Sequence, residues 1–170
     1  NGAAPADDSW MSLITPRLDD KLRTQLDALR NEMAAAGTVD FSIRPDRQRL
    51  LQLRQQLADM GLHGFLIPRT DEHQGEFVAP RAERLRWLTG FSGSAGLAIV
   101  LADTAAIFVD GRYTLQVRQQ ADETVFSPHH LIESPPDKWI AETLPKGGRL
   151  GYDPWLHSQS AAERFAKAAE

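Results

Sequence analysis

Residues 95–110, with the sequence AGLAIVLADTAAIFVD, contain two apolar runs separated by a short break. The first run ends at Leu101 and the second begins at Thr104, so only Ala102 and Asp103 lie between them. Apolar runs of this length are typical of buried strands, and so short a connection favours a tight antiparallel hairpin. We therefore expect a sheet that contains this hairpin.

The residues before the hairpin predict a helix followed by a strand. Leu50, Leu53 and Leu57 recur every three or four positions, which is helical spacing, and Gly61 ends the pattern. Residues 64–68, GFLIP, are typical of a short buried strand that a proline stops.

The residues after the hairpin predict further helices and strands in alternation. We expect a helix over 112–121, with Val117 and Leu115 available for packing, and a strand over 124–131. Such an alternation around a hairpin indicates an α/β fold, in which helices flank a mixed sheet.

The last part of the chain carries recognisable helix starts. Ser134, followed by two prolines, predicts a helix with serine as its cap and proline in its first turn. A strand is expected over 149–153, and Trp155 is expected to pack at the turn that follows. Ser160 and Glu163 have the spacing of a capping box for a terminal helix.

The chain divides by composition into three parts. Residues 1–16 predict a flexible tail, residues 17–46 an extra helix and linker, and residues 47–170 the main domain. The chain begins without methionine and ends inside a helical pattern, so we expect it to be a piece of a longer protein.

The overall composition excludes several classes of protein. The chain has 170 residues, 42% hydrophobic and 25% charged, with a net charge of −4, which is ordinary for a soluble globular protein. An acidic balance makes nucleic acid an unexpected partner, and no apolar stretch approaches the length that spans a membrane. The sequence contains no cysteine, which excludes disulfides and thiolate chemistry.

The five histidines do not form a metal-binding motif. The sequence has no H-E-x-x-H pattern, and no two histidines lie four residues apart. The adjacent His129 and His130 fall in an expected strand, so they point to opposite faces of the sheet. We expect no metal site in this chain.

The glycine-rich run GFSGSAG, residues 90–96, fits neither common phosphate-binding pattern. A dinucleotide loop has a different glycine spacing and leads into a helix, whereas a strand follows here. A phosphate-cradling loop needs Lys before Ser or Thr after its last glycine, but Leu97 and Ala98 follow. A tight turn between elements explains the small residues.

A serine nucleophile in this run is a weaker interpretation. Ser92 lacks the final glycine of the G-x-S-x-G elbow, and no helix follows it. A triad of Ser92, Asp110 and His129 can be drawn, and it predicts an autonomous serine hydrolase.

The stretch FVDGRY, residues 108–113, marks the end of the second apolar run. Asp110 is placed to cap the following helix, so a strand–turn–helix joint explains every residue. Arg112 and Tyr113 at the end of a strand also suit the binding of a carboxylate or a peptide end.

Taken in order, several stretches resemble the N-terminal domain of Xaa-Pro aminopeptidases (aminopeptidase P), and above all the long, three-domain form. The resemblance covers about residues 47–157. It rests on LRQQLADMGLHGFLIPR, EHQGEF, RLRWLTGFSGSAG, VDGRYTLQV, PPDKWIAETLP and GYDPWLH.

This resemblance implies a ribonuclease-H-like domain of the creatinase type without catalytic residues of its own. In the family, a cytoplasmic hydrolase removes the N-terminal residue that precedes proline from peptides. The chemistry lies in a separate C-terminal domain of pita-bread fold, where two Asp, one His and two Glu hold two divalent ions, usually manganese. The expected partners are that catalytic domain, proline-containing peptides and a second copy of the parent in a homodimer.

The resemblance also suggests where this domain meets the substrate. It implies that the domain packs on the catalytic domain and shapes access to the active site. The candidates for that rim are Phe91, Ser92, Asp110, Arg112 and Tyr113, because they lie in the two glycine-containing motifs.

Two alternatives remain open beside the serine hydrolase. The chain can be a stand-alone module that binds small peptides, or the N-terminal domain of a prolidase or creatinase. The combination of GFSGSAG and DGRY favours the aminopeptidase.

Overall fold

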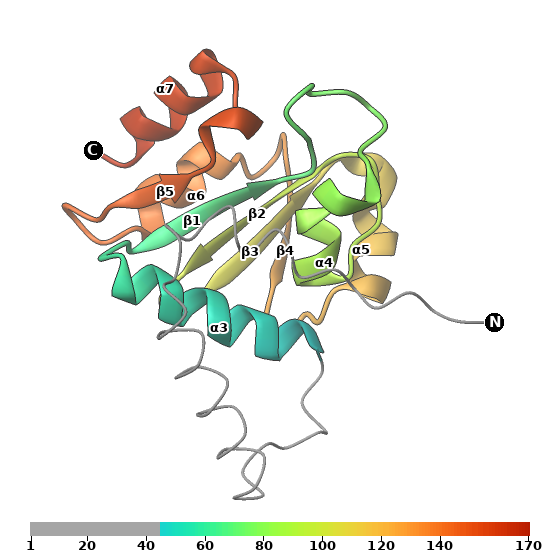
Figure 1. The fold of residues 1–170 in the computed structure, drawn as a ribbon, viewed down its shortest axis with the longest axis horizontal. Coiled ribbons are helices and arrows are strands. Elements are labelled where there is room, and N and C mark those ends of the chain that lie inside the picture. Colours follow the sequence, from blue (N-terminus) through green and yellow to red (C-terminus); the bar gives the residue numbers. More distant parts are fainter. Residues whose placement is uncertain (1–44) are drawn as a thin grey trace, which may run out of the picture. The chain divides into compact units, whose positions relative to one another are not determined.

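A computed structural model describes residues 45–170 (Figure 1). The expected tail over 1–16, and the helix and linker over 17–46 apart from its last two residues, lie outside the described part. The expected start of the main domain at residue 47 stays a prediction.

The described residues form a five-stranded mixed sheet with the strand order β4-β3-β2-β1-β5. Neighbouring pairs are antiparallel for β1–β2 and β2–β3, and parallel for β1–β5 and β3–β4. The expected α/β fold with a mixed sheet is confirmed. The strands are β1 (Gly64–Pro68), β2 (Gly96–Leu101), β3 (Ala105–Val109), β4 (Ser127–His130) and β5 (Leu150–Tyr152).

The hairpin of β2 and β3 lies at the centre of this sheet. Gly96 pairs with Val109 and Val100 pairs with Ala105, which confirms the antiparallel connection. All residues of β3, and all but the first of β2, are buried. Strands that are apolar on both sides need cover on both faces of the sheet.

Helices supply that cover in two layers (Figure 1). On one face, buried side chains of α3, α4 and α5 pack together with Phe91 and Phe126. On the other face, Trp139 and Ile140 of α6 pack with Phe165 of α7. The helices are α3 (Pro45–Asp59), α4 (Arg84–Thr89), α5 (Thr114–Gln120), α6 (Pro136–Thr143) and α7 (Gln159–Ala168), with short 3-10 turns η2 (Pro80–Ala82), η3 (Gly111–Tyr113) and η4 (Pro154–Leu156).

Two expected helix caps are wrong. Pro135 rather than Ser134 occupies the cap position of α6, and Ser134 lies beside His129 instead. The helix α7 begins earlier than expected, because the hydroxyl of Ser158 accepts from the amide of Ala161. Ser160 therefore lies inside the first turn, and its capping box does not form.

Three further predictions, two about side-chain packing and one about the length of a strand, are also wrong. Leu115 and Trp155, expected to pack, are 76% and 75% exposed. The strand expected over 124–131 is only four residues long, because a turn that begins at Asp122 carries the chain as far as Phe126.

The turn at Asp122 is also one of the points that fasten α3 to the rest of the domain, beside the bond from Arg54 to the carbonyl of Leu101 and the packing of Leu50 and Leu57. Asp122 is 7% exposed and accepts a 2.9 Å ion-paired hydrogen bond from Nε of Arg47. The amide and the hydroxyl of Thr124 also donate to this carboxylate, at 3.0 and 2.6 Å. The hydrogen bonds from Thr124 and then from Arg47 lower the pKa of Asp122 from 3.8 to about 2.

We expect Asp122→Asn to lower the free energy of unfolding at pH 7 by about 1–3 kcal/mol, because a hydrogen-bonded carboxylate is lost. The folded pKa lies below the unfolded one, so this stabilisation is present above about pH 4 and fades as the pH falls towards 2. Urea unfolding at pH 7 and pH 3 measures both effects.

Glu123→Gln is the matched control, because it removes the same charge from the neighbouring residue. Glu123 is exposed and pairs with Arg118, so its loss is expected to cost less than about 1 kcal/mol. Equal losses in the two variants would contradict the assignment of Asp122 as a fastening residue.

Candidate functional site

The structure brings the two glycine-containing motifs together at one end of the sheet. The strands β1, β3, β4 and β5 all run in the same direction and end there, and β2 starts there. Because Gly96 pairs with Val109, the turn over 90–96 lies beside the residues that follow β3. The expected rim residues thus share one end of the sheet, although they are up to 22 residues apart in the chain.

The turn over 90–96 is shaped by its glycines. Gly90 ends α4 with φ of +80°, a left-handed conformation that favours glycine. A Cβ at Gly90 would also lie 2.9 Å from the carbonyl oxygen of Gln120. Phe91, which directly follows Gly90, is fully buried in the core, so this expected rim residue does not reach the surface.

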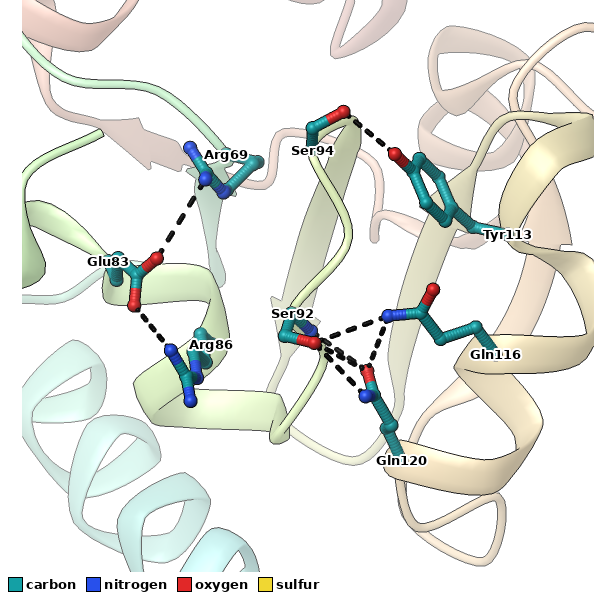
Figure 2. Close-up of polar contacts among 8 residues, drawn as sticks. All are labelled: Arg69, Glu83, Arg86, Ser92, Ser94, Tyr113, Gln116 and Gln120. Atoms are coloured by element: carbon teal, nitrogen blue, oxygen red, sulfur yellow. Dashed lines mark hydrogen bonds and ion pairs between the residues drawn. The ribbon is translucent and has the colours of Figure 1, made fainter. Parts of the chain in front are cut away.

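Ser92 is exposed, and two glutamines of α5 hold it (Figure 2). Its amide donates to Oε1 of Gln120 at 2.9 Å, and its hydroxyl accepts from Nε2 of Gln120 at 3.0 Å. Nε2 of Gln116 reaches the same hydroxyl at 3.2 Å and Oε1 of Gln120 at 3.2 Å. The turn is therefore tied to a helix more than 20 residues away.

Tyr113 fastens the other side of the turn (Figure 2). Its hydroxyl lies 2.8 Å from Oγ of Ser94, and its ring packs edge-on against Phe91 with 5.6 Å between centroids. The hydrogen bond with Ser94 lowers the pKa of Tyr113. Phe91 thus contributes to the candidate site indirectly, because its buried ring supports the half-buried ring of Tyr113.

Asp110 and Arg112 form a closed ion pair beside this tyrosine. Asp110 accepts from the amide of Arg112 at 2.9 Å, which confirms it as the cap of the following turn. The guanidinium of Arg112 binds both carboxylate oxygens, with Nη2 at 2.6 Å from Oδ2. These hydrogen bonds lower the pKa of Asp110, so the pair stays charged and internally neutralised.

The serine-hydrolase triad does not form. His129 stacks on Phe108, with 5.1 Å between ring centroids, and lies against the core on the α6 side of the sheet. Its ring nitrogens lie beside the hydroxyls of Ser127 and Ser134. Ser92 is instead tied to α5 on the opposite face, so the histidine cannot act as its base.

The structure adds a charged cluster that the sequence did not predict. Arg69, at the end of β1, is only 10% exposed, and its Nη2 lies 3.8 Å from Glu83. Glu83 also binds Nη1 of Arg86 at 3.0 Å (Figure 2). The amide of Arg69 donates to the carbonyl of Gly96, so the cluster borders the same turn. The only sign of this cluster in the sequence was the i,i+3 spacing of Glu83 and Arg86, which is typical of an ion pair along a helix.

Neither a metal centre nor a membrane span emerges from residues 45–170. No group of three His, Asp or Glu side chains in this range could hold a metal ion. Within the same range, no helix is both long and apolar enough to cross a bilayer.

Comparison with known proteins identifies the fold. Residues 49–170 match the family model of the creatinase/prolidase N-terminal domain, and the chain belongs to this family. Among solved structures, X-prolyl aminopeptidase of Caenorhabditis elegans, described as a cytosolic enzyme with a di-nuclear active site, aligns with a TM-score of 0.66 and 27% identity, over 74% of this chain and 23% of that one. The N-terminal domain of the cytoplasmic peptidase PepQ of Mycobacterium tuberculosis aligns with a TM-score of 0.52 and 27% identity, over 71% and 84%.

Within the family, the chain is similar to Xaa-Pro aminopeptidases. It is 37% identical to Xaa-Pro aminopeptidase 2 of Homo sapiens over 121 residues, which is 71% of this chain and 18% of the relative. It is 38% identical to aminopeptidase P2 of Arabidopsis thaliana over 122 residues, 69% of this chain and 17% of the relative. The expected resemblance is confirmed, and the chain spans less than a fifth of the length of these relatives.

We expect Gly93→Ala to destabilise the domain by about 1–3 kcal/mol, because a Cβ there would overlap the ring of Phe91. Gly75→Ala is the control: a Cβ at that exposed position would meet only the carbonyl oxygen of Phe77, at 4.0 Å. Thermal unfolding of both variants measures the difference. A loss at Gly93 no larger than that at Gly75 would contradict the packed turn.

Proposed function

We propose that this chain is the non-catalytic N-terminal domain of a metal-dependent Xaa-Pro aminopeptidase of the cytoplasm. In this role the domain packs on the catalytic domain and limits substrate access to peptides with a free N-terminus. The observation that carries the proposal is the identity of 37–38% to Xaa-Pro aminopeptidases across most of the chain. The placement of both family motifs at one end of the sheet supports it.

The site has the properties that a rim needs. Ser92 and Arg112 are exposed, while the turn and helix that carry them are tied together by Gln120 and Tyr113. A rigid protein surface can orient a peptide without the entropy cost of ordering its own side chains on binding. The hydroxyl of Ser92 can bind backbone groups of a peptide, and Arg112 can bind a carboxylate in competition with Asp110.

The metal chemistry of such an enzyme belongs to another part of the protein. Two divalent ions, which we expect to be manganese, would polarise the peptide carbonyl and activate a water. Residues 45–170 do not offer three clustered ligands, so we assign no step of the hydrolysis to them. Their contribution is to position and to select the substrate.

We expect the full-length parent protein, loaded with manganese, to cleave the first bond of an Xaa-Pro-Xaa tripeptide faster than that of an Xaa-Pro dipeptide. The 170-residue chain alone is expected to cleave neither. Release of the N-terminal amino acid measures both. Preference for the dipeptide would favour a prolidase as the parent, and metal-stimulated cleavage by the 170-residue chain would contradict the proposal.

In the full-length enzyme, we expect Arg112→Gln to raise KM for tripeptides about fivefold with kcat little changed. The variant leaves the charge of Asp110 unpaired at the rim, where it repels the substrate carboxylate, and this weakens binding in the ground and transition states alike. Arg118→Gln is the control, since Arg118 on α5 likewise pairs with a carboxylate, that of Glu123 beyond the end of the helix. Equal KM values for Arg112→Gln and the unaltered enzyme would show that Arg112 does not contribute to substrate binding at the rim.

A further inference from the structure

Two arginines beside the turn over 90–96 are largely buried and keep donors that the domain does not use. Arg69 directly follows β1 and is 10% exposed, and Arg84, the first residue of α4, is 20% exposed. We call these two residues the inner arginines. Nη1 of Arg69, and both Nε and Nη1 of Arg84, are buried without a hydrogen-bond partner among residues 45–170. A charged donor is costly to bury unpaired, so these three nitrogens need an acceptor.

The sheet brings the inner arginines to the same end of two neighbouring strands. β1 and β5 are parallel, so Arg69, which follows β1, and Asp153, which follows β5, leave the sheet at the same end. Oδ2 of Asp153 lies 3.9 Å from Nη2 of Arg84, which joins the start of α4 to the end of β5. Oε1 of Glu83, the residue before Arg84, lies 3.8 Å from Nη2 of Arg69. One ligand at this end can therefore reach donors from both arginines.

The two carboxylates near the inner arginines are bound at shorter distance by other groups. Oε2 of Glu83 accepts from Nη1 of Arg86 at 3.0 Å (Figure 2). Oδ1 of Asp153 accepts from the amide of Trp155 at 3.0 Å, in the turn η4. Their distances of 3.8 and 3.9 Å to the inner arginines are too long for hydrogen bonds. A shift of either carboxylate toward an inner arginine would lengthen its own shorter bond, so a further acceptor is needed.

The balance of charge indicates which acceptor fits. The inner arginines and Arg86 carry three positive charges, against the two negative charges of Glu83 and Asp153. Asp71 is also buried, but its carboxylate accepts from the amide of His73 instead. A carboxylate ligand, with one negative charge, would balance the remaining positive charge, whereas a phosphate group carries about −1.5 to −2 at pH 7. The planar guanidinium also matches the planar carboxylate in shape.

We propose that the inner arginines bind the carboxylate of a small molecule, such as an amino acid or a short peptide. The unused donors bind the carboxylate oxygens, while Glu83 and Asp153 keep the two guanidiniums in position. The exposure that remains on both side chains places the site just beneath the surface, within reach of a small ligand. The inference is independent of the proposed function, because it requires neither a catalytic domain nor a peptidase activity.

Thermal unfolding of the 170-residue chain with acetate tests the proposal, because a ligand that binds only the folded state raises Tm. At pH 7 and about 200 mM sodium acetate, we expect Tm to lie about 3 °C or more above its value in sodium chloride of equal concentration. Acetamide has a similar shape without the charge, and adding it to the chloride solution is expected to leave Tm unchanged. Equal Tm values in acetate and chloride would show that water satisfies the donors, and would overturn the proposal.

Arg69→Gln and Arg84→Gln locate the binding. Each is expected to reduce the rise in Tm caused by acetate at least threefold, whatever its effect on Tm without acetate. Arg81→Gln is the matched control and is expected to keep the full rise, since Arg81 is 73% exposed and pairs with Glu72. A rise that survives in both inner-arginine variants would come from a general salt effect or from another site, and would overturn the proposal.

Saturation-transfer NMR on the unaltered chain observes acetate directly, so the test stands even where a variant fails to fold. Transfer to the methyl protons of acetate is expected, and its absence would overturn the proposal.

Other ligands define the chemistry of the site. A rise in Tm with phosphate that equals or exceeds the rise with acetate, at the same ionic strength, would assign the site to phosphate groups and overturn the choice of carboxylate. Glycine and glycylglycine at equal concentration distinguish an amino acid from a peptide as the source of the carboxylate. A larger rise with either supports the proposal and names the source, whereas no rise with either would overturn it.

Discussion

The pairing of two strands that are apolar on both sides is the constraint on which the rest of this domain depends. β2 and β3 cannot leave either side in water, so helices must cover both faces, and α3 to α5 and α6 with α7 do so. The same pairing sets Gly96 opposite Val109. That register brings the turn over 90–96 to the residues after β3, so the candidate site is a direct result of how the core is built.

The strands were predictable because their signal is local. Continuous apolar runs and a stopping proline gave β1, β2 and β3 almost to the residue. The helix caps were not, because neighbouring serines offer equivalent hydroxyls and only the path of the chain selects Ser158 over Ser160. Leu115 and Trp155 failed for a different reason: an apolar side chain at helical or turn spacing packs only where a partner lies, and spacing does not reveal the partner.

The motifs of the candidate site were predictable from the sequence, but the side chains that hold these motifs in place were not. DGRY could be understood locally, since Asp110 caps the turn that follows it. The glutamines of α5 carried no such signal, because Ser92 lies more than 20 residues from them and meets them only through the folded sheet. Phe91 shows the same limit: its motif suggested a place at the surface, whereas in the fold its ring is buried and packs edge-on against Tyr113.

The parallel pairing of β1 and β5 has a consequence for the nascent chain. Gly64 pairs with Leu150, 86 residues later, whereas the central hairpin closes across a few residues. At a synthesis rate of about 5–20 residues per second, β5 follows β1 after about 4–17 s, and until then the outer edge of β1 has no partner strand. During synthesis that bare edge can pair with a wrong strand, so folding of this domain is most vulnerable between the emergence of β3 and that of β5.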